Sequence, residues 1–271
     1  MRTTPITYYG GKQQLASTIL QMIPAHRVYV EPYFGGGAVF FAKGKSYLEV
    51  INDINDNLVT FYEVCQDAAL FPLLMDKIQH TLHSERSYKK AYELWKTPSG
   101  GGKLDIAWAT WLVTNMSFSG SPSGGWKWDN GTAGSHSGVV MDNYRRNFSQ
   151  AIHERLKHVQ ISCRDAMTVI NQRDREETFF FLDPPYPGCV QKHYSGFGFD
   201  DFEKLLERLT TLKGKFLLCN FQSELLTRYI TENGWNIAVK DMALRVANLS
   251  GHNRRKQEVM VFNYDLEPML F

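Results

Sequence analysis

Short apolar runs rich in β-forming residues alternate with amphipathic helical patterns at both ends of the chain, and this alternation most limits the folds it can adopt. Helical patterns follow the second and fourth predicted strands, at Asn55–Ala68 and Asp200–Leu212. Such alternation predicts an α/β fold with a mostly parallel, doubly wound sheet. The predicted strands are Arg27–Val30, Tyr47–Ile51, Val159–Cys163, Thr178–Leu182, Lys215–Cys219, Ile237–Val239 and Glu258–Phe262.

One helical pattern shows its buried face directly. Phe202, Leu205, Leu206 and Leu209 repeat at the spacing of one helix face. We therefore predict that this face packs in the core and carries no chemistry.

The strand signal disappears between residues 57 and 155, where helical stretches surround two Gly/Ser-rich segments. We predict an inserted helical domain at 57–155, and a core domain formed by 1–56 and 156–271. The longer segment, Ser117–Gly138, exceeds the usual length of an unstructured loop, and it contains Trp126 beside Lys127. This composition favours a functional loop.

Composition and charge exclude several protein classes. With 43% hydrophobic residues over 271 positions, the chain is neither disordered nor a disulfide scaffold. A formal net charge of +2 is too small for a polycation held only by phosphate attraction, so any nucleic-acid binding needs local positive charge.

The cysteines and the hydropathy pattern indicate the compartment. The cysteines match no zinc or redox spacing and lie mainly in apolar runs, so we expect reduced core residues. There is no signal peptide and no run of about eighteen apolar residues, which predicts a soluble, cytoplasmic protein without a membrane partner. The four cysteines are Cys65, Cys163, Cys189 and Cys219.

Three glycines after the first predicted strand indicate a cofactor site. Gly35, Gly36 and Gly37 precede an apparent helix start, where backbone N–H groups can approach a ligand closely. No Gly-Lys-Ser/Thr follows, so the spacing does not fit a phosphate loop. A nucleoside-type cofactor is the expected ligand, and an ordinary Gly-rich loop is the alternative.

Two aspartates at predicted strand ends could hold such a cofactor. Asp53 follows the glycines by about twenty residues, where a carboxylate can accept hydrogen bonds from ribose hydroxyls. Asp165 could accept from an adenine amino group. Either residue could instead cap the helix that follows it.

The segment FFFLDPPY, residues 179 to 186, carries the most specific signal. A continuous apolar strand is buried on both faces, so Asp183 at its carboxyl end faces the crevice where open α/β sheets bind ligands. Pro184 and Pro185 remove N–H donors and leave carbonyl acceptors, and Tyr186 can stack on a flat base.

Such a turn suits an exocyclic amino group, which is a poor nucleophile because its lone pair is delocalised. Hydrogen bonds from its two N–H groups to the Asp183 carboxylate and the Pro184 carbonyl would favour a tetrahedral nitrogen aimed at an electrophilic methyl group. The alternative, a rigid strand-end turn, explains the prolines but not all four residues.

Taken in order along the chain, these segments resemble the DNA adenine methylase family, the D12-class, α-group N6-adenine methyltransferases that use S-adenosylmethionine. The resemblance implies a Rossmann-like class I methyltransferase fold, methylation of adenine N6 in double-stranded DNA after base flipping, and no metal. It implies Asp183, Pro184, Pro185 and Tyr186 as the catalytic residues. The cofactor-binding residues it implies are Tyr8, Lys12, Glu31, Phe34, Gly35, Gly36, Gly37, Asp53 and Asp165.

The resemblance also makes the helical insertion the DNA target-recognition domain. Asn220 lies where the family has a polar turn near the flipped base. Arg254, Arg255 and neighbouring cations are candidates for phosphate contacts, a solvated surface being the alternative. The predicted DNA-binding residues are Ser119, Trp126, Lys127, Arg145, Arg254, Arg255 and Lys256.

Other functions remain open. An acceptor-rich turn could equally serve cytosine N4, an RNA adenine or a protein amide, and a catalytically silent DNA-binding subunit would keep the fold. We expect a monomer or weak dimer, with a cognate restriction endonuclease as a functional partner. GATC is the common target of the family.

Overall fold

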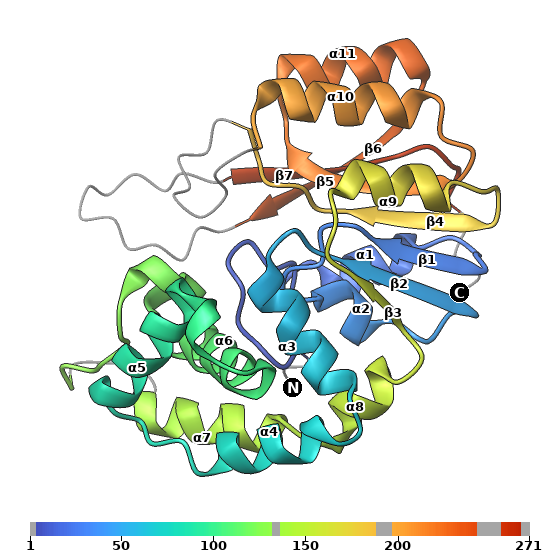
Figure 1. The fold of residues 1–271 in the computed structure, drawn as a ribbon. Coiled ribbons are helices and arrows are strands. Elements are labelled where there is room, and N and C mark those ends of the chain that lie inside the picture. The colour runs from blue at the N-terminus through green and yellow to red at the C-terminus, as the bar shows by residue number, and fades with distance from the viewer. Residues whose placement is uncertain (1–3, 132–135, 188–196, 243–255, 267–271) are drawn as a thin grey trace. The chain divides into compact units, whose positions relative to one another are not determined.

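A computed structural model describes residues 4–131, 136–187, 197–242 and 256–266. Seven strands form one sheet in the order β3-β2-β1-β4-β5-β7-β6 (Figure 1). They are β1 (Val28–Glu31), β2 (Leu48–Asn52), β3 (Gln160–Ser162), β4 (Thr178–Leu182), β5 (Lys215–Phe221), β6 (Asn236–Met242) and β7 (Lys256–Phe262).

The helices fall between these strands and through the middle of the chain. They are α1 (Ala16–Met22), α2 (Ala38–Ala42), α3 (Asp56–Gln66), α4 (Leu70–Gln79), α5 (Glu85–Lys96), α6 (Lys103–Met116), α7 (Ser137–Asn147), α8 (Gln150–Leu156), α9 (Ala166–Arg173), α10 (Phe199–Thr210) and α11 (Glu224–Asn233). Short 3-10 turns are η1 (Pro98–Gly100), η2 (Phe118–Gly120) and η3 (Pro122–Gly124).

The sheet topology confirms the predicted doubly wound α/β fold. Strands β2 and β3, β1 and β4, and β4 and β5 pair in parallel. The chain builds outward from β1 to β3 and then resumes beside β1 with β4, so the strand order reverses there. Strand β7 pairs antiparallel with both β5 and β6, so the sheet is mostly, but not entirely, parallel. Each predicted strand is present: β4 has the predicted bounds, and the other strands have one or both ends shifted by one to three residues.

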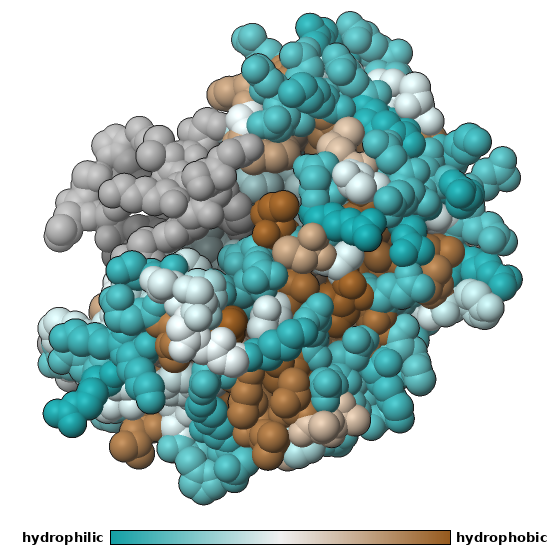
Figure 2. Space-filling model, viewed as in Figure 1, coloured by the Kyte–Doolittle hydropathy of each residue, from teal (hydrophilic) through white to brown (hydrophobic). Residues whose placement is uncertain are grey.

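The chain divides into two compact units. Unit 1 comprises residues 1–21, 34–45 and 49–165, and unit 2 comprises residues 22–33, 46–48 and 166–271. In unit 2, β4 is buried along its whole length. The predicted stripe of α10 is confirmed, since Phe202, Leu205, Leu206 and Leu209 are all buried. The face of α10 and α11 seen in Figure 2 is mostly hydrophilic.

Unit 1 contains the long helical stretch. From α3 to α8 the described residues form helices and 3-10 turns, with one isolated bridge between Ser117 and Trp126. Helix α6 is buried from Ala107 to Met116. The assignment of 57–155 to target recognition stays a prediction.

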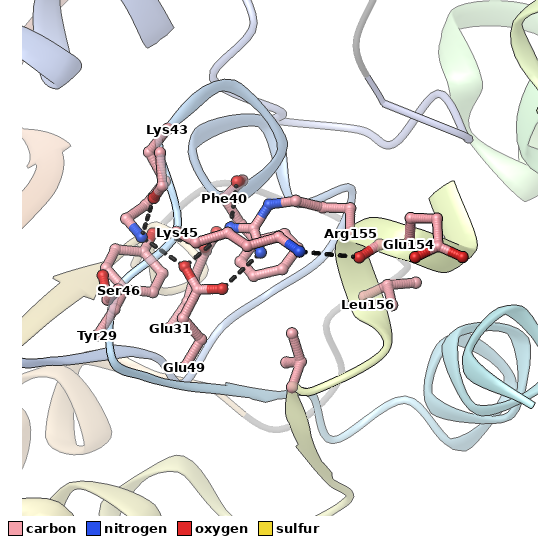
Figure 3. A network of polar contacts seen from close by, with 12 residues as sticks. Tyr29, Glu31, Phe40, Lys43, Lys45, Ser46, Glu49, Glu154, Arg155 and Leu156 are labelled. Carbon is pink, nitrogen blue, oxygen red and sulfur yellow. Dashed lines mark hydrogen bonds and ion pairs between the residues drawn. The ribbon is translucent and has the colours of Figure 1, made fainter. Parts of the chain in front are cut away.

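A buried ionic network connects three elements of unit 1 (Figure 3). Glu49 on β2 accepts from Lys43 Nζ at 2.6 Å and from both terminal nitrogens of Arg155 at 2.5 and 2.8 Å. Arg155 follows Glu154 on α8, also donates to the Phe40 carbonyl at 2.9 Å, and stacks over that ring. The network joins α8 to α2 and β2.

The cysteine prediction was wrong at one position. Cys65 and Cys219 are buried free thiols, but Cys163 is exposed because β3 ends at Ser162 and Cys163 begins a loop. Cys189 lies outside the described residues.

Among the described helices, no single one is long and apolar enough to cross a membrane. Helices α3 and α4 reach that length and apolarity only as a pair, and they are bent by 107° at the break between them.

Candidate active site

The glycine loop connects β1 to α2 through two left-handed residues. Gly35 has φ 49° and Gly37 has φ 64°, conformations that favour glycine. The Gly37 N–H donates to the Phe34 carbonyl at 2.8 Å, and a Cβ at Gly37 would lie 2.5 Å from the Phe34 ring. The triple glycine is therefore required for this turn, whatever ligand it binds.

The N-terminal segment lies against this loop within unit 1. A Cβ at Gly35 would lie 2.9 Å from Tyr8 Cδ1, and one at Gly36 would lie 3.0 Å from Tyr8 Cβ. Lys12 is buried, and its Nζ donates to the Gly10 carbonyl at 3.0 Å. Two segments that the resemblance assigned to the cofactor thus lie together.

Asp53 connects the end of β2 to the glycine loop. Its Oδ2 accepts from the Gly35 N–H at 2.8 Å and its Oδ1 from the Asn55 N–H at 2.9 Å. Burial raises the pKa of Asp53, and backbone donors from Asn55, Gly35 and Ile54 oppose that shift. The helix-cap alternative for Asp53 is wrong, because Asn55 caps α3 by accepting from the Asn57 N–H.

The loop after β3 is fixed by a residue that sequence reasoning missed. The buried Asn52 side chain donates to the Arg164 carbonyl at 2.9 Å and accepts from the Arg164 N–H at 3.0 Å and from Ser162 Oγ at 2.8 Å. Asp165 follows this clamp, is exposed, and immediately precedes α9. Its predicted contact with the cofactor adenine remains untested.

Two predicted cofactor residues are buried in protein contacts. Glu31, at the end of β1, accepts from the Tyr29 hydroxyl at 2.6 Å. The Phe34 ring packs edge-on against Tyr62, with centroids 4.7 Å apart, and against Phe40. The Phe34 side chain therefore supports the loop from the core, and its predicted cofactor contact stays a prediction.

The FFFLDPPY segment forms the predicted strand-end turn in unit 2. Strand β4 pairs with β1 through Val28–Thr178, Tyr29–Phe179 and Val30–Phe180. Asp183 follows β4, just as the glycine-loop segment follows β1 along the chain. Asp183 is half-buried and Pro184 is buried, so the carboxylate keeps access to solvent.

Tyr186 is held by contacts that no sequence pattern indicated. Its hydroxyl donates to Glu258 Oε1 at 2.6 Å, with Asp183 Oδ1 at 3.4 Å. Its ring meets Phe221 edge-on, with centroids 4.4 Å apart. Burial raises the pKa of Tyr186 well above its ordinary value, and the Asp183 and Glu258 carboxylates add to this shift. The phenol therefore stays protonated.

Asn220, the other residue singled out in this unit, is buried at the end of β5. Its Oδ1 accepts from the Phe221 N–H at 2.8 Å, and its Nδ2 has no partner among the described residues.

The predicted DNA-binding residues are only partly described. The Trp126 ring packs 5.5 Å from His83, and the Lys127 N–H donates to the Met116 carbonyl at 2.8 Å, so both belong to a folded loop. Trp128, at 57% exposed, is the accessible tryptophan there. Ser119 lies in η2, and Lys256 begins β7. Arg254 and Arg255 lie outside the described residues.

Arg145 is engaged within the protein. Its guanidinium donates to the Thr81 carbonyl and pairs with Asp142 at 2.5 Å, and only 18% of the side chain is exposed. A contact between the Arg145 guanidinium and DNA would require it to leave these partners, and its predicted role in DNA binding stays a prediction.

Asn115 at the end of α6 connects the loop region to the N-terminal segment. Its Oδ1 accepts from the Thr7 N–H at 2.9 Å and from Thr7 Oγ1 at 3.0 Å, and its Nδ2 donates to the Pro5 carbonyl at 3.3 Å. Gly120 packs on the same threonine, where a Cβ would lie 2.8 Å from its methyl group.

Asn115→Ala is therefore expected to lower the free energy of unfolding by about 1–3 kcal/mol, because it leaves two part-buried donors of Thr7 without this acceptor. It should also weaken cofactor binding, since Thr7 precedes Tyr8. Urea unfolding and calorimetry measure the two effects. Asn143→Ala, at an exposed position on α7, is the control. Equal unfolding free energies and cofactor affinities in the two variants would refute a role of Asn115 in holding the segment before Tyr8.

Among the described residues, no group of three histidine, cysteine, aspartate or glutamate side chains could hold a metal ion. The expectation of a metal-free reaction stays a prediction.

The fold and the turn define a class of protein: a doubly wound α/β protein with a glycine loop after β1 and an acceptor-rich turn after β4, which pairs in parallel with β1. The sequence profile of the D12 class N6 adenine-specific DNA methyltransferases matches residues 8–100 and 135–243. The chain belongs to this family, so its substrate is DNA and its target is the adenine N6.

Similar proteins cover nearly the whole chain. The Type II methyltransferase M.MjaIII of Methanocaldococcus jannaschii is 25% identical over 298 residues, covering 96% of this chain and 98% of that protein. M.CviBI of Paramecium bursaria Chlorella virus NC1A is 25% identical over 83% of this chain and 86% of its own length. M1.LlaDCHI of Lactococcus lactis subsp. cremoris is 25% identical over 94% of this chain and 93% of its own length.

Proposed function

We propose that this enzyme transfers a methyl group from S-adenosylmethionine to the N6 of an adenine extruded from double-stranded DNA, at one recognition sequence. The observation that carries this proposal is Asp183, a half-buried carboxylate followed by two prolines at the end of the fully buried β4. One of the two parallel neighbours of β4 is β1, and the chain continues from β1 into the glycine loop.

The residues of unit 1 fit the proposed cofactor. Bound S-adenosylmethionine would supply an activated methyl group on a positively charged sulfur. Asp53 offers carboxylate lone pairs for ribose hydroxyls while two backbone N–H groups hold it in place. The turn at Gly35 and Gly37 carries no side chains, which lets its backbone approach a ligand closely. Asp165 is exposed and follows the loop that Asn52 holds, and it would accept a hydrogen bond from the amino group of the cofactor's adenine.

The turn in unit 2 would activate the acceptor nitrogen. Asp183 and the Pro184 carbonyl would each accept one N–H of the adenine N6 amino group, which favours a tetrahedral nitrogen with its lone pair exposed. After transfer, the excess proton on N6 can pass to the Asp183 carboxylate or to solvent. Fixed hydrogen-bond acceptors need little reorganisation during this step.

The target base must first leave the duplex, at a cost of a few kcal/mol. Stacking on the Tyr186 ring would offset about 1–3 kcal/mol of that cost. The loop after α6 and the cations of the segment before β7 would contact the DNA. The names of the relatives, all Type II methyltransferases, favour a restriction-modification setting with a cognate endonuclease. We further propose a cytoplasmic location and a monomeric or weakly dimeric enzyme.

The substrate test offers the enzyme labelled S-adenosylmethionine with separate DNA, RNA and protein pools. We expect label in DNA, recovered by mass spectrometry as N6-methyladenine, and sequencing of the methylated DNA would give the recognition site. Label confined to cytosine, RNA or protein would refute the proposal, and absence of label from every pool would favour a silent DNA-binding subunit.

Asp53→Ala is expected to weaken cofactor binding by about 10- to 100-fold, because hydrogen bonds to a charged group contribute about 1.5–3 kcal/mol. Asp53→Asn keeps one acceptor and should lose less. Calorimetry with S-adenosylmethionine measures both, and the exposed Asp76→Ala on α4 is the control. Unchanged affinity in Asp53→Ala would assign this carboxylate to loop structure alone.

A further inference from the structure

Glu258 is a buried carboxylate that the proposed chemistry does not use. It lies on β7 with 7% of its surface exposed. Its Oε1 accepts from the Tyr186 hydroxyl at 2.6 Å. Removing a carboxylate from water is costly, and here a bond to the last residue of the DPPY turn offsets part of that cost.

The register of the sheet directs Glu258 and Phe221 to the same tyrosine. Phe221 on β5 pairs directly with Glu258 on β7, so both side chains project from the same face of the sheet. Phe221 contacts the Tyr186 ring edge-on at an interplanar angle of 75°. Tyr186 is thus held at its ring by Phe221 and at its hydroxyl by Glu258.

Two carboxylates of the described residues lie near the Tyr186 hydroxyl and could accept its proton. Glu258 Oε1 lies at 2.6 Å from the hydroxyl, whereas Asp183 Oδ1 lies at 3.4 Å. Because hydrogen bonds weaken steeply beyond about 3.2 Å, the proton is donated to Glu258. The Tyr186 hydroxyl therefore competes only weakly with a substrate amino group for Asp183.

We propose that Glu258 is a positioning residue for base capture: it fixes the plane of the Tyr186 ring on which the extruded adenine stacks and keeps the phenol proton away from Asp183. This inference rests on the proposed function. It predicts that Glu258 acts entirely through the Tyr186 hydroxyl.

The experiment compares Glu258→Leu, Glu258→Gln, Tyr186→Phe and the double variant Glu258→Leu/Tyr186→Phe. We expect Glu258→Leu to lower kcat about 10- to 100-fold, since small misplacements of reacting groups have effects of this size. The KM for S-adenosylmethionine should stay near wild type. Glu258→Gln keeps an acceptor oxygen and should recover most activity. The exposed Glu203→Gln on α10 is the control.

A second readout is independent of turnover. A duplex with 2-aminopurine at the methylated position, identified by sequencing DNA that the wild type has modified, reports base extrusion and stacking by fluorescence. Glu258→Leu and Tyr186→Phe should change this signal alike, and the double variant should behave like either single variant, because both remove the same contact.

The outcomes separate the two proposals. A wild type that does not methylate DNA refutes the proposed function, and with it this inference. A wild type that methylates, with Glu258→Leu matching it in kcat and fluorescence, refutes the positioning role alone. Additive losses in the double variant also refute it. If Glu258→Leu fails to fold, Tyr186→Phe and Glu258→Gln provide the test. A lowered kcat in Tyr186→Phe together with a kcat near wild type in Glu258→Gln supports the positioning role, and any other combination refutes it.

Discussion

Asp183→Ala is expected to reduce methyl transfer by at least about 10²- to 10³-fold while S-adenosylmethionine still binds. The carboxylate follows β4 and is half-buried, so it can accept an N–H from the target amino group. Without it the Pro184 carbonyl is the remaining acceptor, and the N6 lone pair stays delocalised into the ring.

Asp183→Asn separates geometry from charge. It keeps an acceptor oxygen but lacks the negative charge that strengthens a hydrogen bond as positive charge develops on N6. Its loss should therefore be intermediate. Single-turnover rates with DNA isolate the chemical step from binding and release.

Cofactor calorimetry and an exposed control complete the test. Asp200→Ala, in the first turn of α10, removes an exposed carboxylate from the same unit and should leave the rate near wild type. Near-normal turnover in Asp183→Ala would rule out the proposed activation. Loss of cofactor binding together with rate would place Asp183 in the cofactor site instead.

Local sequence patterns predicted the framework. Strand β4 was predicted with its exact bounds, because four consecutive apolar residues, Phe179 to Leu182, are followed by Asp183 and two prolines, and this pattern ends a buried strand at Leu182. The α10 stripe followed from helical periodicity. The turn between β1 and α2 was predicted from its three glycines, and the structure adds that Gly35 and Gly37 are left-handed.

The residues that hold the candidate site in place could not be predicted, because their partners lie far away in the sequence. Glu258 contacts a tyrosine 72 positions earlier, and Asn115 contacts Thr7 across 108 positions. Each looked like an ordinary residue of a strand or a helix. Asn52 is similar, because its clamp on the loop before Asp165 exists only once β2 and β3 have paired.

Long-range pairing also explains where local reasoning misplaced side chains. Cys163 looked like a core residue of an apolar run, but β3 pairs with β2 only as far as Ser162. The partner of Arg145 also lies far away in the sequence, because its guanidinium reaches the carbonyl of Thr81, which follows α4, while its predicted role in DNA binding stays a prediction. A sequence pattern shows neither where the pairing of two strands ends nor which distant carbonyl an arginine contacts.

Glu49→Gln is expected to destabilise the fold by about 3–5 kcal/mol at neutral pH, because it leaves two buried cations without their anion. The side chains of Glu49 and Lys43 are each 5% exposed, and that of Arg155 is 12% exposed. Glutamine keeps the shape of the side chain and can still accept a hydrogen bond, so the difference measures the missing charge. Urea unfolding gives the free energy.

The same variant should change the response to acid. Burial acts to raise the pKa of Glu49, but the hydrogen bonds and charges of Arg155 and Lys43 outweigh it and hold this pKa below its ordinary value. A carboxyl with a lowered pKa in the folded state stabilises the fold above its unfolded pKa, and this contribution is lost as the pH falls through the folded pKa. Glu49→Gln lacks that contribution, so the gap between the two proteins should narrow in acid.

The exposed pair between Glu63 and Lys103, in the same unit, supplies the matched control. Glu63→Gln should change the free energy of unfolding by less than about 1 kcal/mol, because solvent screens an exposed pair. Equal destabilisation by the two substitutions would show that the buried network contributes no more than a surface ion pair. A gap between wild type and Glu49→Gln that stays constant down to acid pH would assign the loss to packing rather than charge.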